Sequence, residues 1–150
     1  MGQIIWRSSS FSALKLADWY RISQARLAVF VLEQHCPYQD LDDKDACAEH
    51  VTGWVDQQLA AYLRILPPGV SYPEPALGRV LTHPEFRRGG YGRDLMHAGI
   101  KRCIALHGEQ PIRIGAQQYL ERFYQSFGFH TVSPPYDEDG IAHLIMLRLA

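Results

Sequence analysis

The chain has 150 residues, of which 47% are hydrophobic and 21% charged, values typical of a globular protein with a single domain at 1–150. Its 15 basic and 16 acidic residues are intermixed and leave a formal charge of −1, which excludes the strong positive field that binding to nucleic acid or an anionic membrane would need. The sequence contains neither an apolar run of about 20 residues nor a secretory leader, so we expect a cytoplasmic protein.

The three cysteines cannot all pair within the chain, and we expect reduced thiols. Cys36 and Cys47, taken with His35 and His50, match no zinc-ligand spacing, so no metal site is expected. Cys103 falls on the apolar face of a predicted helix and is expected in the core.

The first half of the chain predicts a strand, a long helix and a hairpin. Residues 3–7 are typical of a strand, and the hydroxyls of Ser8–Ser10 are expected to cap a helix that runs, with one break, to about Glu33. The predicted apolar stripe of this helix comprises Leu16, Tyr20, Leu27 and Val31, widened by Ala17, Ile22 and Phe30. The acidic segment Asp40 to Asp45 is expected to be an exposed loop. Two strands, 50–55 and 59–66, should then form an antiparallel hairpin.

The second half begins with a proline-rich surface loop at 67–75. The elements predicted after it are, in chain order, a strand at 76–83, a helix ending near 107, a strand at 112–116, a helix at 119–127 and strands near 129–132 and 142–149. This order predicts an α/β or α+β fold with a central sheet covered by helices.

The most informative segment is the glycine-rich turn Arg87-Arg88-Gly89-Gly90-Tyr91-Gly92, which joins a strand to a helix. The first amides of a helix have no acceptors within the helix, and the helix dipole favours an anion there. Arg87, Arg88 and Arg93 could add charge-assisted hydrogen bonds to phosphate. The alternative is a solvated turn whose glycines only permit positive φ. Because neither the Rossmann nor the P-loop pattern is present, a dinucleotide or ATP is poorly supported as the ligand.

With Arg87, Gly90 and Gly92 in this turn and an aromatic segment at 123–129 (FYQSFGF) downstream, the sequence resembles the GNAT superfamily of N-acetyltransferases. The resemblance extends to the ElaA-like subfamily through Arg26, residues 29–31, Glu33-Gln34, residues 36–40, residues 115–117 and residues 136–143. It implies a mixed, mostly antiparallel sheet whose fourth and fifth strands splay apart, with acetyl-CoA wedged between them.

The resemblance also implies which residues bind the cofactor. Amides of the turn would hold the diphosphate of acetyl-CoA, and the main chain of the fourth strand would pair with the pantetheine arm. Gln117 would line the same cleft. The predicted cofactor-binding residues are Val80, Leu81, Thr82, Arg87, Arg88, Gly89, Gly90, Tyr91, Gly92, Arg93 and Gln117.

Acetyl transfer to an amine needs a base for the ammonium ion and a proton donor for the departing thiolate. By resemblance Tyr124 would be that general acid, with packing of an aromatic ring as the alternative. Glu33 is the first candidate for the base, and His50, His143 and a water relay are the other candidates. His83, before Pro84, is expected to end a strand.

Two arginines in predicted core elements, Arg26 and Arg79, need anionic partners. The partner is either an acidic group of the substrate or, as we favour, Glu33 or an aspartate in a buried ion pair. The sequence as a whole predicts an acetyl-CoA-dependent N-acetyltransferase that acts by direct attack on a small amine in a ternary complex. A noncatalytic acyl-CoA-binding module and an interaction domain with an empty cleft are the alternatives, and assembly as a homodimer stays open.

Overall fold

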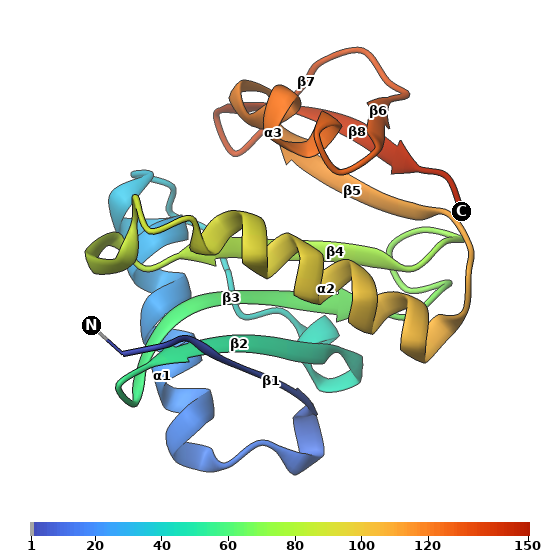
Figure 1. Cartoon of the computed structure of the whole chain (residues 1–150). Helices are drawn as coiled ribbons and strands as arrows, with labels where there is room; N and C mark the ends of the chain where they lie inside the picture. Colours follow the sequence, from blue (N-terminus) through green and yellow to red (C-terminus); the bar gives the residue numbers. More distant parts are fainter. Residues whose placement is uncertain (1) are drawn as a thin grey trace.

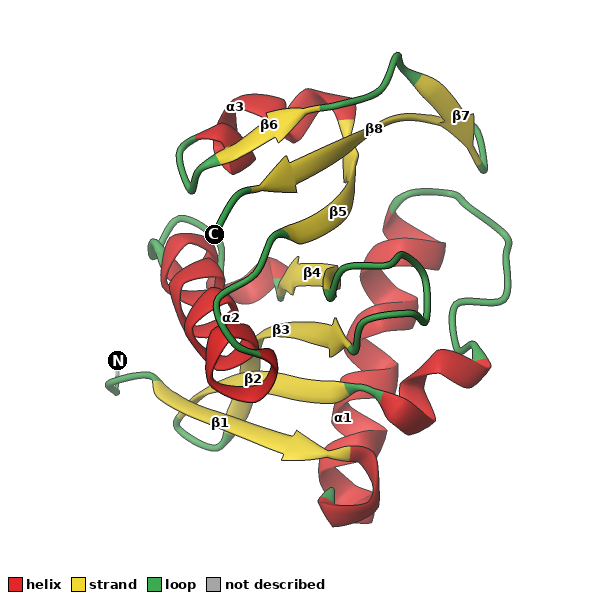
Figure 2. Ribbon diagram, turned by 90° about the vertical axis from the view of Figure 1, so that its right-hand side faces the viewer, coloured by secondary structure: helices red, strands yellow, loops and turns green. Residues whose placement is uncertain are grey.

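Residues 2–150 of the computed structural model form one sheet with helices on both faces (Figures 1 and 2). Its strands are β1 (Ile5–Ser10), β2 (Glu49–Val55), β3 (Gln58–Leu66), β4 (Ala76–Thr82), β5 (Ile112–Gln117), β6 (Phe129–Thr131), β7 (Tyr136–Glu138) and β8 (Ile141–Arg148). They are ordered β1-β2-β3-β4-β5-β8-β6, with β7 paired to β8. All pairs are antiparallel except β4 with β5, as the predicted fold requires.

The predicted hairpin is confirmed as β2 and β3, which turn at Asp56 and Gln57 with positive φ at both residues. The helical elements are α1 (Leu16–Arg26), α2 (Tyr91–His107) and α3 (Glu121–Gln125), a π-helical continuation of α1 named η2 (Leu27–Glu33), and the 3-10 turns η1 (Phe11–Ala13), η3 (Asp43–Cys47), η4 (Pro84–Phe86) and η5 (Gln118–Leu120). No helix within residues 2–150 is both long and apolar enough to cross a bilayer.

Helix α2 covers one face of the sheet (Figure 2), where it buries Leu95, Met96, Ile100 and Cys103 in the main hydrophobic core. The expected core position of Cys103 is therefore confirmed. Gly99 lets this helix approach β3 closely, because a Cβ there would lie 2.5 Å from Leu63 Cδ2. The contact at the middle of α2 holds this helix close to β3.

The first helix differs from its prediction. Leu16 and Tyr20, placed in the buried stripe, are 85% and 62% exposed. Ile22 and Phe30, which were predicted to widen the stripe, are buried as expected, but they share the buried face with Ala25, Val29 and the side chain of Arg26. Because Arg26 and Ala25 lie on the buried face, its hydrophobic periodicity is weak in the sequence. The predicted stripe was therefore centred on the wrong face of the helix.

Two further expectations about secondary structure are wrong. The serines of residues 8–10 belong to β1 and pair with β2, so no serine hydroxyl caps α1, which begins after Lys15 without a side-chain cap. The short strand β7 was not predicted, and it pairs with β8 through Tyr136 and His143. This hairpin forms one wall of the site.

Candidate active site

Strands β4 and β5 diverge (Figure 1), and side chains on both strands line a cleft between them. Within residues 2–150 the two strands share a single bridge, between Ala76 and Arg113 near the beginning of each strand. Beyond it β5 pairs only with β8. The cleft has a volume of about 900 Å³ and reaches from η2 to the β7–β8 hairpin. The splay predicted for the fourth and fifth strands is therefore present.

Strand β4 bulges beside this cleft. Its pairing to β3 shifts between Leu81, opposite Tyr62, and Gly78, opposite Arg64, so β4 carries an extra residue here. Arg79 lies in the bulge with φ of 51°, an unfavourable backbone angle for a residue with a Cβ. The bulge keeps the backbone of β4 from continuing a regular ladder toward β5, and its main-chain groups border the cleft.

The residues predicted to contact the pantetheine arm gather here. Val80, Leu81 and Thr82 line the cleft from β4, and Gln117 lines it from the end of β5. Gln117 Nε2 donates a hydrogen bond of 3.2 Å to Gln34 Oε1, which joins the two walls.

The glycine-rich turn leads directly into α2. Gly90 occupies the N-cap position with φ of 78°, and α2 begins at Tyr91. A hollow of about 240 Å³ lies over this helix start and is lined by Thr82, Phe86, Arg87, Arg88, Gly90, Tyr91, Gly92, Arg93 and Phe123. Most of the residues predicted to hold a diphosphate therefore surround one hollow at the positive end of a helix dipole.

Replacing Gly90 with valine should raise the Kd for CoA at least about tenfold, because a β-branched residue resists the φ of 78° on which this helix start depends. Gly108→Val is the matched control, since Gly108 ends the same helix with φ of 86° and open space around it. Calorimetric titration with CoA measures both variants. Equal affinities in the two variants would place the phosphate site elsewhere.

Arg87 is already engaged within the protein. It forms a bidentate ion pair with Glu33, with distances of 2.8 and 2.7 Å, and its Nε donates to Thr82 O. The hydrogen bond from Arg87 lowers the pKa of Glu33. The pair ties the end of η2 to the glycine-rich turn, and a carboxylate stabilised in this way is a weak proton acceptor.

Tyr124 lies on α3 and is 6% exposed, with its side chain in the lining of the cleft. Burial raises the pKa of Tyr124 above its ordinary value, so the phenol keeps its proton at neutral pH. Among residues 2–150 no hydrogen bond to its hydroxyl is formed, although its ring packs edge-on against Phe123 and Phe129. Both roles considered for this residue, packing and proton donation, are compatible with this position.

The three histidines considered from the sequence have different surroundings. His50 is fully buried, with one ring nitrogen 2.7 Å from Tyr62 Oη and the other 3.0 Å from Asp45 O, and burial lowers its pKa. His143 lines the cleft from β8. His83 follows β4 and accepts a hydrogen bond from the amide of Glu85, as expected for a strand end.

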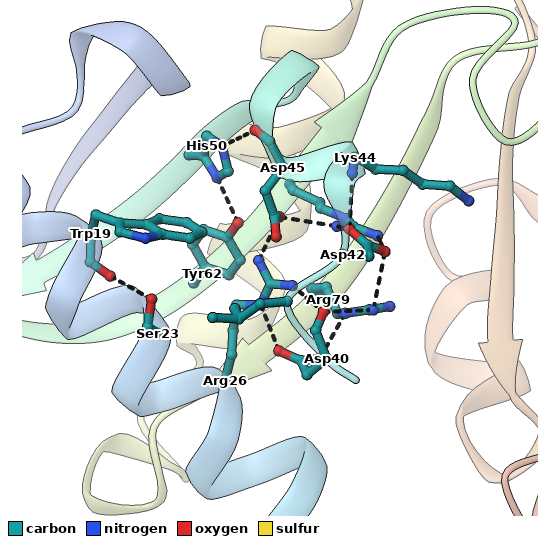
Figure 3. Close-up of polar contacts among 12 residues, drawn as sticks. Trp19, Ser23, Arg26, Asp40, Asp42, Lys44, Asp45, His50, Tyr62 and Arg79 are labelled. Atoms are coloured by element: carbon teal, nitrogen blue, oxygen red, sulfur yellow. Dashed lines mark hydrogen bonds and ion pairs between the residues drawn. The ribbon is translucent and has the colours of Figure 1, made fainter. Parts of the chain in front are cut away.

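The acidic segment 40–45 is not the exposed loop that was predicted. Asp40 and Asp45 are 1% and 4% exposed. Arg26, itself fully buried, binds both of them, with Nε 2.9 Å from Asp40 Oδ2 and Nη1 2.6 Å from Asp45 Oδ1 (Figure 3). The ion pair favoured for Arg26 is therefore present with aspartates and not with Glu33.

Two more arginines complete this network. Arg64 lies 2.6 Å from Asp42 and 3.0 Å from Asp45, and Arg79 Nε lies 2.8 Å from Asp40 Oδ1. Burial opposes ionisation of Asp42, but the hydrogen bond from Arg64 and the charges of Arg64, Arg79 and Arg26 together outweigh it and lower the pKa of Asp42 to about 2. Three arginines and three aspartates thus balance one another beneath the cleft, and they anchor the β4 bulge through Arg79.

The cysteines and histidines considered for a metal do not converge. Cys36 Sγ donates to Asp139 O, and Cys47 is exposed. His50 is hydrogen-bonded to Tyr62 in the core. Within the part of the chain that the structure describes, no group of three His, Cys, Asp or Glu side chains is arranged to hold a metal ion.

Sequence reasoning missed the residues that close the far end of the cleft. Tyr72 from the proline-rich loop and Tyr136 and Glu138 from β7 all line it. Alternation of Tyr136 and Glu138 before the turn at Asp139-Gly140 was the available signal for a hairpin, but the segment is only three residues long.

Comparison with known proteins places this geometry in a family. The model of the acetyltransferase (GNAT) domain matches residues 20–149. Protein ElaA of Escherichia coli (strain K12) is 40% identical over 147 residues, which is 97% of this chain and 96% of ElaA. The crystal structure of E. coli ElaA matches with a TM-score of 0.92 at 38% identity and covers 97% of this chain and 99% of that one.

Two further solved structures are similar. An acyl-CoA N-acyltransferase from Pseudomonas aeruginosa matches with a TM-score of 0.93 at 35% identity, over 97% of this chain and 99% of that chain. PaiA N-acetyltransferase from Thermoplasma acidophilum, solved in complex with coenzyme A, shares the fold with a TM-score of 0.72 at 14% identity, over 99% of each chain.

Proposed function

Because the chain belongs to the GNAT acetyltransferase family and is an acyltransferase, we propose that it transfers an acetyl group from acetyl-CoA to a primary amine by direct attack in a ternary complex. The observation that carries the proposal is the cleft between β4 and β5, which runs from the hollow at the start of α2 to a far end lined by polar side chains. In this arrangement the thioester lies in the cleft, with its diphosphate over the helix start.

The reaction makes one C–N bond and breaks one C–S bond. The amine nitrogen attacks the thioester carbonyl carbon, and a main-chain amide of β4 stabilises the developing oxyanion. The C–S bond then breaks and the sulfur receives a proton from the Tyr124 hydroxyl. The new amide nitrogen loses its remaining extra proton to the solvent, from which Tyr124 regains one. The position of Tyr124 in the lining of the cleft supports this role. Burial keeps its phenol protonated, so the hydroxyl proton is present when a thiolate forms, although the raised pKa also makes the phenol a weaker acid.

His143 is the candidate base that the surroundings favour. Glu33 is neutralised by Arg87, and both ring nitrogens of His50 are occupied in the core. His143 lines the cleft. Its Nδ1 is hydrogen-bonded to Ile141 O, and its second ring nitrogen, Nε2, faces Glu138. The proton removed from the ammonium ion would pass to this second nitrogen and leave to solvent after transfer.

If Glu33 is not the base, Glu33→Gln should keep kcat within about threefold of the original, since only a solvent-exposed ion pair with Arg87 is lost. His143→Gln should lower kcat by about 10² in the same assay, the scale of a general base. If kcat instead fell by about 10² in the Glu33 variant and changed little in the His143 variant, Glu33 would be the base.

Steady-state acetylation of a panel of small primary amines, with acetyl-CoA as donor and thiol release as the readout, tests the function. Turnover that depends on both acetyl-CoA and an amine is expected. Tight binding of acetyl-CoA without turnover of any amine would instead indicate a noncatalytic acyl-CoA-binding module. Failure to bind CoA at millimolar concentration would indicate a cleft used for another purpose.

A further inference from the structure

Two tyrosine hydroxyls converge on one point of β5 at the far end of the cleft. A Cβ placed on Gly115 would lie 3.2 Å from Tyr136 Oη and 3.4 Å from Tyr72 Oη. Neither hydroxyl has a hydrogen-bond partner among residues 2–150, although both rings line the cleft. Burial, with the charge of Glu138 added, raises the pKa of Tyr136 to about 12 and also raises the pKa of Tyr72. Both groups are therefore neutral phenols whose oxygens are free to accept hydrogen bonds.

His143 lies next to this point, because its ring centroid is 5.9 Å from that of Tyr136 and the two residues pair between β7 and β8. His143 Nδ1 is 2.8 Å from the carbonyl oxygen of Ile141, which can only accept, so Nδ1 carries a proton. In the neutral imidazole Nε2 then presents a lone pair, and it faces Glu138 Oε2 at 3.3 Å. This contact needs a proton, which comes either from Nε2 of a protonated imidazole, paired with Glu138, or from a bound donor beside the two atoms.

The hairpin beside these acceptors is negatively charged, and Arg113, whose guanidinium lies 5.8 Å from the centre of the Tyr72 ring, is itself paired with Glu74. Within residues 2–150 Glu138 has no lysine or arginine partner, and Asp137 and Asp139 flank it on the same hairpin. Cys36, whose thiol donates to Asp139 O of this hairpin, shows the effect of that charge, because burial and the three carboxylates together raise the pKa of the thiol.

We propose that this end of the cleft, formed by Tyr72, Gly115, Tyr136, Glu138 and His143 and named here the ammonium pocket, binds the acceptor as a primary ammonium ion. An ammonium ion carries three N–H donors and one positive charge, which match the carboxylate, the imidazole lone pair and the phenol oxygens. The inference rests on the proposed function, because it names the acceptor class for that reaction.

The same geometry selects against α-amino acids. A carboxylate on the carbon next to the amino group would lie against the acidic hairpin, where like charges repel. We therefore expect amines without a neighbouring carboxylate to be preferred. Binding in the ammonium pocket also places the nitrogen beside His143 Nε2, so that the imidazole can take the proton and pair with Glu138 while the nitrogen lone pair attacks the thioester.

Matched acceptors test the selectivity at saturating acetyl-CoA. The kcat/KM for phenethylamine should exceed that for phenylalanine at least about tenfold, and phenylalanine amide, which lacks the carboxylate charge, should recover most of the difference. Equal or better use of phenylalanine would overturn the inference while leaving the proposed function intact.

Variants test the residues of the pocket. Glu138→Gln should raise KM for phenethylamine about tenfold without changing KM for acetyl-CoA. Asp137→Asn is the matched control, because Asp137 lies on the same strand, accepts from the amide of Gly140 and does not line the cleft. Gly115→Ala should also raise KM for the amine, since its methyl group would crowd both hydroxyls. Identical kinetics for the Glu138 and Asp137 variants would overturn the inference.

Direct titration separates the pocket from the chemistry. Phenethylamine should bind the full chain in a calorimeter, phenylalanine should bind more weakly, and Glu138→Gln should weaken the binding of phenethylamine. This pattern without any acetyl transfer would support the ammonium pocket and refute the proposed function. Absence of phenethylamine binding, together with active acetyl transfer to other acceptors, would refute the ammonium pocket and support the proposed function.

Discussion

Replacement of Arg26 with methionine is expected to lower the free energy of unfolding by about 3–5 kcal/mol, the cost of removing one partner from a buried ion pair. Arg26 is fully buried, and its loss leaves Asp40 and Asp45 with uncompensated charge in the interior. Burial alone would disfavour the charge of Arg26, yet the hydrogen bond to Asp45 and the surrounding carboxylates raise its pKa, so its positive charge is favoured overall. Urea unfolding followed by circular dichroism measures the change.

Arg102→Met is the matched control for Arg26, because Arg102 on α2 forms a partly exposed ion pair with Glu49 at the start of β2. Its loss should cost about 0–1 kcal/mol. If the Arg26 variant lost no more stability than the Arg102 variant, the network would not stabilise the fold. Asp40 also contacts Arg79, so the Arg26 variant should perturb the β4 bulge before it unfolds the chain.

Tyr124→Phe is expected to lower kcat by about 10² while the affinity for acetyl-CoA changes less than about twofold. The ring remains to pack against Phe123 and Phe129, and the missing hydroxyl makes no hydrogen bond within residues 2–150, so stability should be nearly unchanged. Steady-state kinetics and calorimetry together separate turnover from binding.

Tyr20→Phe removes a hydroxyl from the exposed side of α1 and should have no effect on turnover, which makes it the control for the Tyr124 variant. Unchanged kcat in the Tyr124 variant would leave its ring a packing role only. The sulfur would then need another proton donor.

The parts of the fold that depend on local sequence patterns could be predicted from the sequence. Alternating apolar residues with a short turn specify β2 and β3, and glycines after a strand specify the start of α2. The residues proposed to bind the cofactor through their main chain, Val80 to Thr82 and the turn at residues 87–93, were predicted from the same local signals and from the family resemblance.

Long-range pairing was not predictable. Asp40 reads as a loop residue until Arg26 and Arg79, which lie 14 and 39 positions away, are brought against it. Glu33 appears available as a base until Arg87, 54 positions away, neutralises it. In both cases the property of the side chain depends on a partner that no local pattern identifies.

The ammonium pocket was hidden from the sequence for a related reason. Tyr72, Gly115 and Glu138 come from a proline-rich loop, a strand and a hairpin, and only the folded sheet brings them together. The absence of a side chain at Gly115 becomes informative only when the structure shows the hydroxyls of Tyr72 and Tyr136 beside it.

The central claim is that the main chain at the start of α2 holds the diphosphate of the cofactor. A crystal of the full chain soaked with CoA tests this directly. The account predicts phosphate oxygens within hydrogen-bond distance of the amides of Gly92 and Arg93, in the hollow beside Thr82, with the thiol directed between β4 and β5 toward Tyr124. A diphosphate bound anywhere else on the molecule would contradict it.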